Sequence, residues 1–204
     1  MSNNKTLLIK APSTIDADLL AVDEMRVTLR TPANYGGTSG DNAIGLSEKG
    51  TFKVLSGNST LLITNNDKDF SPVNGTNETD ISIVSLKDYT KLLRLGGNGN
   101  YSIIGFKTFY ADNNIDILED CPSLTSLNIN SSNVTGDISK LSTLTGLTRL
   151  KLFDGNISGS FSSIVNLMPN LAGDIYLTKG VTYTDADLAT IKSRGGNIVT
   201  GTKV

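Results

Sequence analysis

Apolar residues in the second half of the chain recur with a 23-residue period, the spacing from Leu127 to Leu150. Each unit contains a Leu-x-x-Leu-x-Leu segment, then an apolar-x-Gly-x-apolar segment and a final apolar residue. The two clearest copies place these residues as follows: Leu124, Leu127, Ile129, Val134, Gly136, Ile138 and Leu141, and then Leu147, Leu150, Leu152, Ile157, Gly159, Phe161 and Ile164. Side chains two residues apart lie on the same face of a strand. Since one unit cannot cover its own apolar face, the pattern predicts units that stack through parallel strands.

The same register continues on both sides of these two copies. Equal steps towards the N-terminus meet apolar pairs at the same positions: Ile104 and Phe106 with Ile115 and Leu118, and then Ile81 and Ile83 with Leu92 and Leu95. Towards the C-terminus, the segment 168–171 matches the segment 121–124, but the next strand pair, Ile175 and Leu177, comes two residues late. We interpret this delay as a two-residue loop insertion.

The repeat resembles the leucine-rich repeat family. Residues 144–161 look like its 23–24-residue repeat, in which Leu-x-x-Leu-x-Leu is followed by Leu-x-Gly-x-Ile. The resemblance covers about 79–183 and is clearest over 120–185; it implies a leucine-rich-repeat-like solenoid with parallel strands. The family's asparagine after the strand is replaced by Ser132 and Gly155, with Asn133 and Asn156 one residue later. We therefore expect backbone or hydroxyl groups, instead of an asparagine ladder, to close this turn.

Different elements are predicted on either side of the repeats. At the C-terminus, Thr184 is a candidate N-cap for a helix that ends at Gly195 and Gly196, and residues 197–200 return as a short strand, so 184–204 is a cap.

Residues 1–78 do not follow the register. They predict strands at 7–10, 25–30, 51–55 and 60–64 and a short helix at 13–24. We interpret 1–78 as a small β-rich region that caps the solenoid or docks to a partner, with shorter irregular repeats as the alternative. The whole chain is predicted to be mainly β and poor in α-helix.

Composition excludes several kinds of chemistry. The 204 residues contain no histidine and one cysteine, which rules out a histidine-based catalytic set and a disulfide within the chain. A net charge of −2 gives no reason to expect binding to nucleic acid. No apolar run approaches the roughly 18 residues of a membrane span, and the first apolar run is too short for a signal peptide. We expect no cofactor, no metal and no membrane insertion.

Three local features are candidate sites for which a structural interpretation is favoured. Cys121 precedes a proline at a repeat position and is predicted to be buried, because no histidine is present to activate it. The aspartate pairs Asp67 with Asp69 and Asp112 with Asp116 lack the dense oxygen set of a calcium loop. The segment 96–100 has glycines but no following Gly-Lys-Ser/Thr, so it is predicted to be a turn between units.

Residues 1–78 are predicted to carry the main docking surface or to bury it against the solenoid, and the outward, concave face of the strands is predicted as a secondary binding surface. The register places these side chains on it: Ser82, Val84, Gly105, Lys107, Asn128, Asn130, Lys151, Phe153, Tyr176 and Thr178. Phe153 and Tyr176 fall on adjacent units with Lys151 beside them, and exposed aromatic groups near polar groups suit protein recognition. The alternative is that Phe153 only covers a strand end.

These observations favour a non-enzymatic interaction or structural protein. The low-charge composition, rich in Asn, Ser, Thr and Gly, and the polar start without an export signal suggest a subunit of a tailed-phage virion, in the tail, a fibre or the head decoration. Its partners would be other protein subunits of a larger assembly. The alternative is a bacterial cell-surface or secreted leucine-rich-repeat adhesin that binds host proteins or glycans and carries a signal upstream. An enzyme is the third and least supported class.

Overall fold

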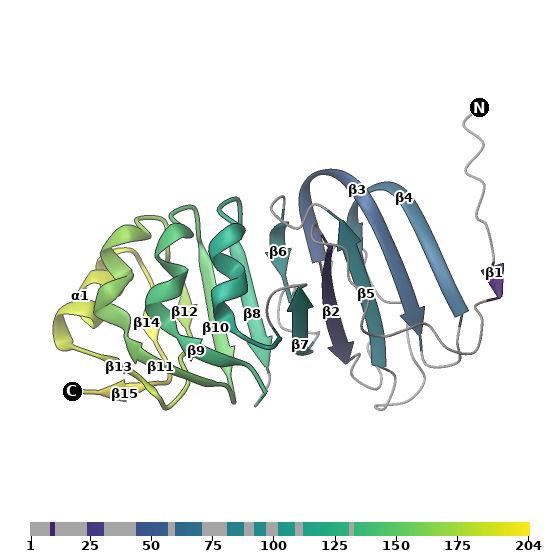
Figure 1. The fold of residues 1–204 in the computed structure, drawn as a ribbon. Helices are drawn as coiled ribbons and strands as arrows, with labels where there is room; N and C mark the ends of the chain where they lie inside the picture. The colour runs from purple at the N-terminus through teal and green to yellow at the C-terminus, as the bar shows by residue number, and fades with distance from the viewer. Residues whose placement is uncertain are drawn as a thin grey trace.

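Strands make up most of the described structure, as the sequence predicts (Figure 1). The computed structural model describes residues 9–10, 24–30, 44–56, 60–70, 81–87, 92–96, 102–108, 112–130 and 133–204. The N-terminal part contains the strands β1 (Ile9–Lys10), β2 (Glu24–Arg30), β3 (Ile44–Ser56), β4 (Thr60–Phe70), β5 (Ile81–Lys87), β6 (Leu92–Leu95) and β7 (Ser102–Thr108). The later strands are β8 (Ser126–Asn130), β9 (Thr135–Asp137), β10 (Arg149–Phe153), β11 (Asn156–Ser160), β12 (Asp174–Ile175), β13 (Val181–Tyr183), β14 (Asn197–Ile198) and β15 (Thr202–Lys203). Between them lie the 3-10 helices η2 (Ile115–Asp120), η3 (Ile138–Thr143), η4 (Phe161–Ser163) and η5 (Val165–Leu167), and the helix α1 (Asp185–Ser193).

Successive units of the C-terminal part pair in parallel, in the register that the sequence predicts. Strand β10 pairs with β8 so that Leu150 lies opposite Leu127, and β11 pairs with β9. A parallel bridge joins Lys151 to Tyr176 in the next unit. These two residues are two positions further apart than the 23-residue repeat spacing, which confirms the predicted insertion. Strand β12 pairs with β14, also in parallel. The short helices lie side by side along one side of these strands (Figure 1).

The predicted register is wrong for the segments around residues 81–83 and 104–106. Strands β5 and β7, which contain them, both pair antiparallel with β2. On the edge of β8 away from β10, the parallel partner is β6, with Leu95 opposite Leu127, a spacing of 32 residues instead of 23. The physical reason is that alternating apolar residues specify which face of a strand is buried but not the direction of its neighbour.

The sheet continues across the predicted boundary after residue 78. Strand β3 pairs antiparallel with β4, β5 and β6, and β6 pairs with β8, so hydrogen bonding links the N-terminal strands to the repeats. The strands predicted at 25–30, 51–55 and 60–64 lie in β2, β3 and β4, and of the strand predicted at 7–10 the structure describes β1. The helix predicted over 13–24 lies outside the described residues, apart from Glu24, which begins β2. The division into 1–78 and 79–204 remains a prediction.

The predicted C-terminal helix and strand are confirmed. Thr184 caps α1: its hydroxyl accepts a hydrogen bond from the amide of Asp187, whose carboxylate accepts one from the Thr184 amide. This reciprocal pair satisfies two amides at the start of the helix. Strand β14 then returns beside β12, and β15 pairs with β13, so the C-terminal segment adds one more layer to the stack.

A continuous apolar core runs through the stack. Leu127, Leu150 and Ile175 occupy the same position in successive units and have no exposed surface. The same cluster includes Met25 and Ile44 from β2 and β3, so it extends into the N-terminal strands. Burial of each such side chain stabilises the fold by about 2 kcal/mol.

Threonine hydroxyls connect successive units along the edges of this core. Each donates a hydrogen bond to a backbone carbonyl of the preceding unit: Thr148 to Thr125 (2.9 Å), Thr143 to Glu119 (3.1 Å), Thr178 to Ile157 (2.6 Å), Thr200 to Leu177 (2.8 Å) and Thr202 to Lys179 (2.6 Å). Asn133 and Asn156 are exposed. The expectation that backbone or hydroxyl groups close the turn at Ser132 and Gly155 remains a prediction.

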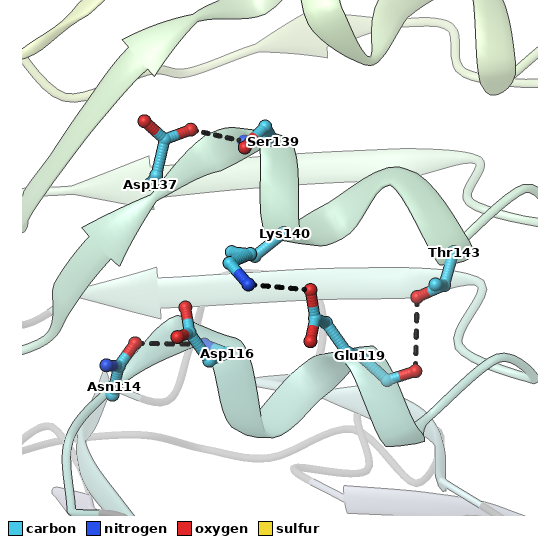
Figure 2. A network of polar contacts seen from close by, with 7 residues as sticks. All are labelled: Asn114, Asp116, Glu119, Asp137, Ser139, Lys140 and Thr143. Carbon is cyan, nitrogen blue, oxygen red and sulfur yellow. Dashed lines mark hydrogen bonds and ion pairs between the residues drawn. The ribbon is translucent and has the colours of Figure 1, made fainter.

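Two of the short helices, η2 and η3, have polar side-chain caps (Figure 2). Asn114 and Asp137 stand before η2 and η3, and each side-chain oxygen accepts a hydrogen bond from the amide two residues later. Lys140 of η3 reaches Glu119 of η2 at 3.2 Å. Gly159 packs against the Asp137 cap: its φ is +107°, and a Cβ there would lie 2.7 Å from the Asp137 carboxylate. Glycine is therefore required at this position both by the backbone conformation and by the close approach.

The Leu150→Ala substitution is expected to lower the free energy of unfolding by about 2–5 kcal/mol, because it leaves a cavity in the buried column. Urea denaturation followed by circular dichroism measures this loss. The matched control is Leu167→Ala, since Leu167 is 47% exposed and its truncation removes little buried surface. Equal losses for the two variants would contradict the assigned register.

The Asp137→Ala substitution is expected to cost about 1 kcal/mol, the usual effect of removing a helix cap, whereas Asp137→Asn keeps an acceptor and costs less. The hydrogen bonds from Ser139 lower the pKa of Asp137 below its ordinary value. A lowered pKa in the folded state stabilises the protein above the ordinary carboxylate pKa of about 4, and this contribution is lost as the pH falls through the folded-state pKa. Urea titrations from neutral to strongly acidic pH should therefore show the wild-type advantage over Asp137→Asn shrinking at the acidic end. A constant difference would show that the carboxylate charge does not contribute.

Candidate functional site

Three residues of the predicted binding surface come together on the outward face of the strands. Lys151 and Phe153 lie on β10, and Tyr176 follows β12 in the next unit. The ring centroids of Phe153 and Tyr176 are 4.8 Å apart with an interplanar angle of 42°, and the Lys151 ammonium lies 5.1 Å from the centre of the Tyr176 ring. All three side chains are partly exposed. We call Lys151, Phe153 and Tyr176 the strand-face cluster.

The strand-face cluster stands between two hollows in the surface. One, of about 560 Å³, crosses the starts of the strands and is lined by Arg94, Thr125, Ser126, Thr148, Arg149, Lys151, Ala172, Gly173 and Asp174. The other, of about 570 Å³, crosses their ends and is lined by Leu152, Phe153, Asp154, Gly155, Asn156, Ile157, Ser158, Leu177, Thr178, Lys179, Gly180 and Thr200. Lys151 borders the first hollow and Phe153 borders the second. The cluster therefore has one hollow on its Lys151 side and the other on its Phe153 side.

Cationic side chains are among the described residues that line the first hollow. Ser126 pairs with Arg94 of β6 on one side and with Arg149 of β10 on the other, so both arginines lie in one row across the strands. Among the described residues, Lys151 and the carboxylate of Asp174 also line this hollow. Sequence reasoning missed both arginines. The alternation around Leu150 could have placed Arg149 outward, but the position of Arg94 depends on the longer spacing between β6 and β8, which the repeat does not show.

Two residues predicted to be on the exposed surface are buried. Asn128 is 2% exposed, and its side-chain amide donates a hydrogen bond to the Gly96 carbonyl oxygen at 3.3 Å. Thr178 is 4% exposed and donates to the Ile157 carbonyl oxygen. Each therefore joins neighbouring segments and does not face a partner. Asn130, at the end of β8 opposite Phe153, is exposed as predicted.

The remaining predicted surface residues lie on strands with a different pairing. Lys107 and Gly105 are on β7, and Ser82 and Val84 are on β5, and both strands pair with β2. The parallel pairing that would have aligned Lys107 with Asn130 is wrong, because β8 pairs with β6 and β10. Except for the buried Gly105, the exposure of these side chains lies outside the described part of the structure.

Within the described ranges, no group of three or more His, Cys, Asp or Glu side chains could hold a metal ion, and no helix there is long and apolar enough to cross a membrane. The expectation that the protein needs no metal or cofactor remains a prediction. Asp116 lies beside the η2 cap, where its backbone amide donates to Asn114.

Cys121 is buried, as predicted. It has no exposed surface, and its sulfur lies 4.0 Å from the Ile117 carbonyl oxygen. Burial, together with the nearby charge of Asp120, raises the pKa of the Cys121 thiol to about 12. Since the thiolate is the nucleophile, the thiol is inert near neutral pH.

Cys121 is expected to react with a maleimide dye at mildly alkaline pH far more slowly in the folded protein than in concentrated urea. The rate is measured by mass spectrometry of the labelled chain. A Ser193→Cys variant is the control, because Ser193 is exposed at the end of α1 and the added thiol should react quickly. If folded wild-type protein reacted as fast as that control, the buried placement of Cys121 would be wrong.

The site thus consists of an aromatic and cationic cluster between a first hollow at the strand starts and a second hollow at the strand ends. Such a surface offers charge, ring edges and hydrogen-bonding groups. No family model, no curated protein and no solved structure matches the chain, so the function has to be inferred from its own residues and geometry.

Proposed function

We propose that this chain is a non-catalytic protein-binding protein built on a leucine-rich-repeat-like solenoid. The parallel register of successive units and the continuous apolar column support this architecture. Stacked repeats present an extended outward strand face, which proteins of this kind use for binding. The observation that carries the proposal is the strand-face cluster, in which two aromatic rings and one ammonium group meet on that face.

The cluster has the composition of a binding anchor. Aromatic and cationic residues are enriched among the side chains that dominate binding energy in protein interfaces. Contact with Tyr176 restrains the Phe153 ring, which lowers the entropy lost when a partner binds. The two adjoining hollows offer space for partner side chains on both sides of the rings.

The proposed setting is a tailed-phage virion, where the protein would be a tail, fibre or head-decoration subunit bound to other protein subunits. The support is the low-charge composition rich in Asn, Ser, Thr and Gly. The N-terminal region, whose strands continue the sheet, is a second docking surface in this proposal. Mass spectrometry of purified particles and of cell-surface fractions would find the protein in the particles. Recovery from the bacterial surface instead would support the adhesin alternative.

Photo-crosslinking tests the binding surface directly. A benzoylphenylalanine group placed at Phe153 in the full chain should give a protein adduct in the assembled particle. The same group at Leu167, which is exposed on η5, should not. Phe153→Ser combined with Tyr176→Ser should weaken binding to the partner so identified by about 30-fold or more, with little change in melting temperature. Adducts from position 167 alone, or unchanged binding by the double variant, would contradict the proposed surface.

A further inference from the structure

The hollow at the strand ends offers groups that suit a sugar. We propose that this hollow binds a neutral hexose ring of a glycan, with sugar hydroxyls bound by Asp154 and Lys179 and the apolar face of the ring against Phe153. The inference goes beyond the proposed function, because it assigns a saccharide ligand to one of the two hollows that adjoin the protein-binding surface. The volume of about 570 Å³ lies in the range of small-molecule binding sites.

The floor of this hollow is held together by hydrogen bonds between units. Segments of three successive units line it, and their aliphatic side chains Leu152, Ile157 and Leu177 are buried. The Thr178 hydroxyl donates to the Ile157 carbonyl oxygen at 2.6 Å, and the Thr200 hydroxyl donates to the Leu177 carbonyl oxygen at 2.8 Å. The floor is therefore formed before a ligand arrives, which limits the entropy lost on binding.

Exposed polar side chains stand around this floor. Asp154 and Lys179 supply opposite charges from neighbouring units, and Ser158 adds a hydroxyl. Asp154, directly after β10, has a φ of +53°, which is uncommon for a residue other than glycine. Among the described residues, neither the Asp154 carboxylate nor the Lys179 ammonium forms a hydrogen bond or an ion pair. A ligand that uses both groups has to offer donors to the carboxylate and acceptors to the ammonium.

A hexose supplies this combination of groups. Each sugar hydroxyl both donates and accepts, so adjacent hydroxyls can donate to the two oxygens of Asp154 while another accepts from Lys179. The C–H groups on one face of the ring form an apolar surface that fits against the Phe153 ring at the edge of the hollow. An anionic ligand would be attracted by Lys179 but repelled by Asp154, whereas a neutral sugar gains from both.

The backbone around the hollow does not suit the addition of a peptide strand. Extended peptides bind open sheet edges through main-chain hydrogen bonds. Here the amides of Leu152 and Asn156 donate to carbonyl oxygens of neighbouring units, and the Ile157 carbonyl oxygen accepts from Thr178. Recognition in this hollow therefore depends on side chains, which favours a hydroxyl-rich ligand over an extended peptide.

The test measures the binding of neutral sugars to the full chain. Saturation-transfer NMR with the methyl glycosides of glucose, galactose and mannose identifies the preferred ring, and calorimetry gives its dissociation constant. Asp154→Asn should weaken binding about tenfold, because a charged acceptor is lost. Asparagine tolerates the same backbone conformation, so the fold is kept. Asp174→Asn, which changes an exposed carboxylate at the other hollow, is the matched control and should leave binding unchanged.

A second pair of variants tests the ammonium group. Lys179→Gln should weaken binding severalfold, and Lys192→Gln, at an exposed position on α1, should leave it unchanged. No binding of any of the three sugars, or equal binding by wild type and Asp154→Asn, would overturn the saccharide assignment. Tighter binding of the corresponding uronic acid would also overturn it, because Asp154 would then not accept from the ligand.

The outcomes separate this inference from the proposed function. Phe153 borders both surfaces and is therefore left unchanged in the sugar-binding test. Absence of any adduct from position 153 in the crosslinking experiment would remove the proposed function and leave the saccharide site intact. Failure of all three sugars to bind would remove the saccharide site and leave the protein-binding surface intact.

Discussion

The described C-terminal structure depends on the burial of one column of aliphatic side chains that no single unit can cover. Leu127, Leu150 and Ile175 occupy equivalent positions in neighbouring units and reach no solvent. Because side chains at this position must meet, the backbone between them has to return to the same point after each unit. This requirement explains why β8 and β10 pair in parallel and why η2 and η3 lie beside each other. It also explains why the two-residue insertion before β12 is accommodated in a loop and leaves the column unbroken.

The polar groups form their hydrogen bonds at the spacing between units that the buried column imposes. Between strands, backbone amides and carbonyls pair directly, and where the chain bends, threonine hydroxyls reach the carbonyls of the unit before. A hydroxyl can both donate and accept, as Thr200 does with the carbonyl and amide of Leu177. Buried backbone groups at a bend would otherwise lose hydrogen bonds that water supplies in the unfolded chain. The abundance of threonine therefore has a structural use, which composition alone could not reveal.

The repeat was predictable from the sequence where one unit pairs with the next, and much less so where that pattern ends. The sequence predicted the spacing between Leu127 and Leu150 and the cap at Thr184, because a repeated apolar pattern and helix-capping residues are visible in the local sequence. The pairing of β6 with β8 could not be predicted in this way, because the alternation of apolar and polar residues specifies a buried face and carries no information on strand direction. The same contrast holds at the candidate site, where the contact between Phe153 and Tyr176 follows from their outward positions in the repeat. Asn128 also has an outward position in the repeat, but it is buried. Gly96, which follows β6, lies beside it, and the Gly96 carbonyl oxygen accepts a hydrogen bond from the Asn128 side-chain amide.

The strand-face cluster is divided between two units, with Lys151 and Phe153 on β10 and Tyr176 after β12. Its geometry exists only while these units are stacked. A partner that contacts both rings therefore binds the stacked state and not the separated one, so binding and stacking are thermodynamically linked. Occupancy of the surface then strengthens the coupling between the two units that share it. In this protein a ligand would act as an additional crosslink between adjacent layers.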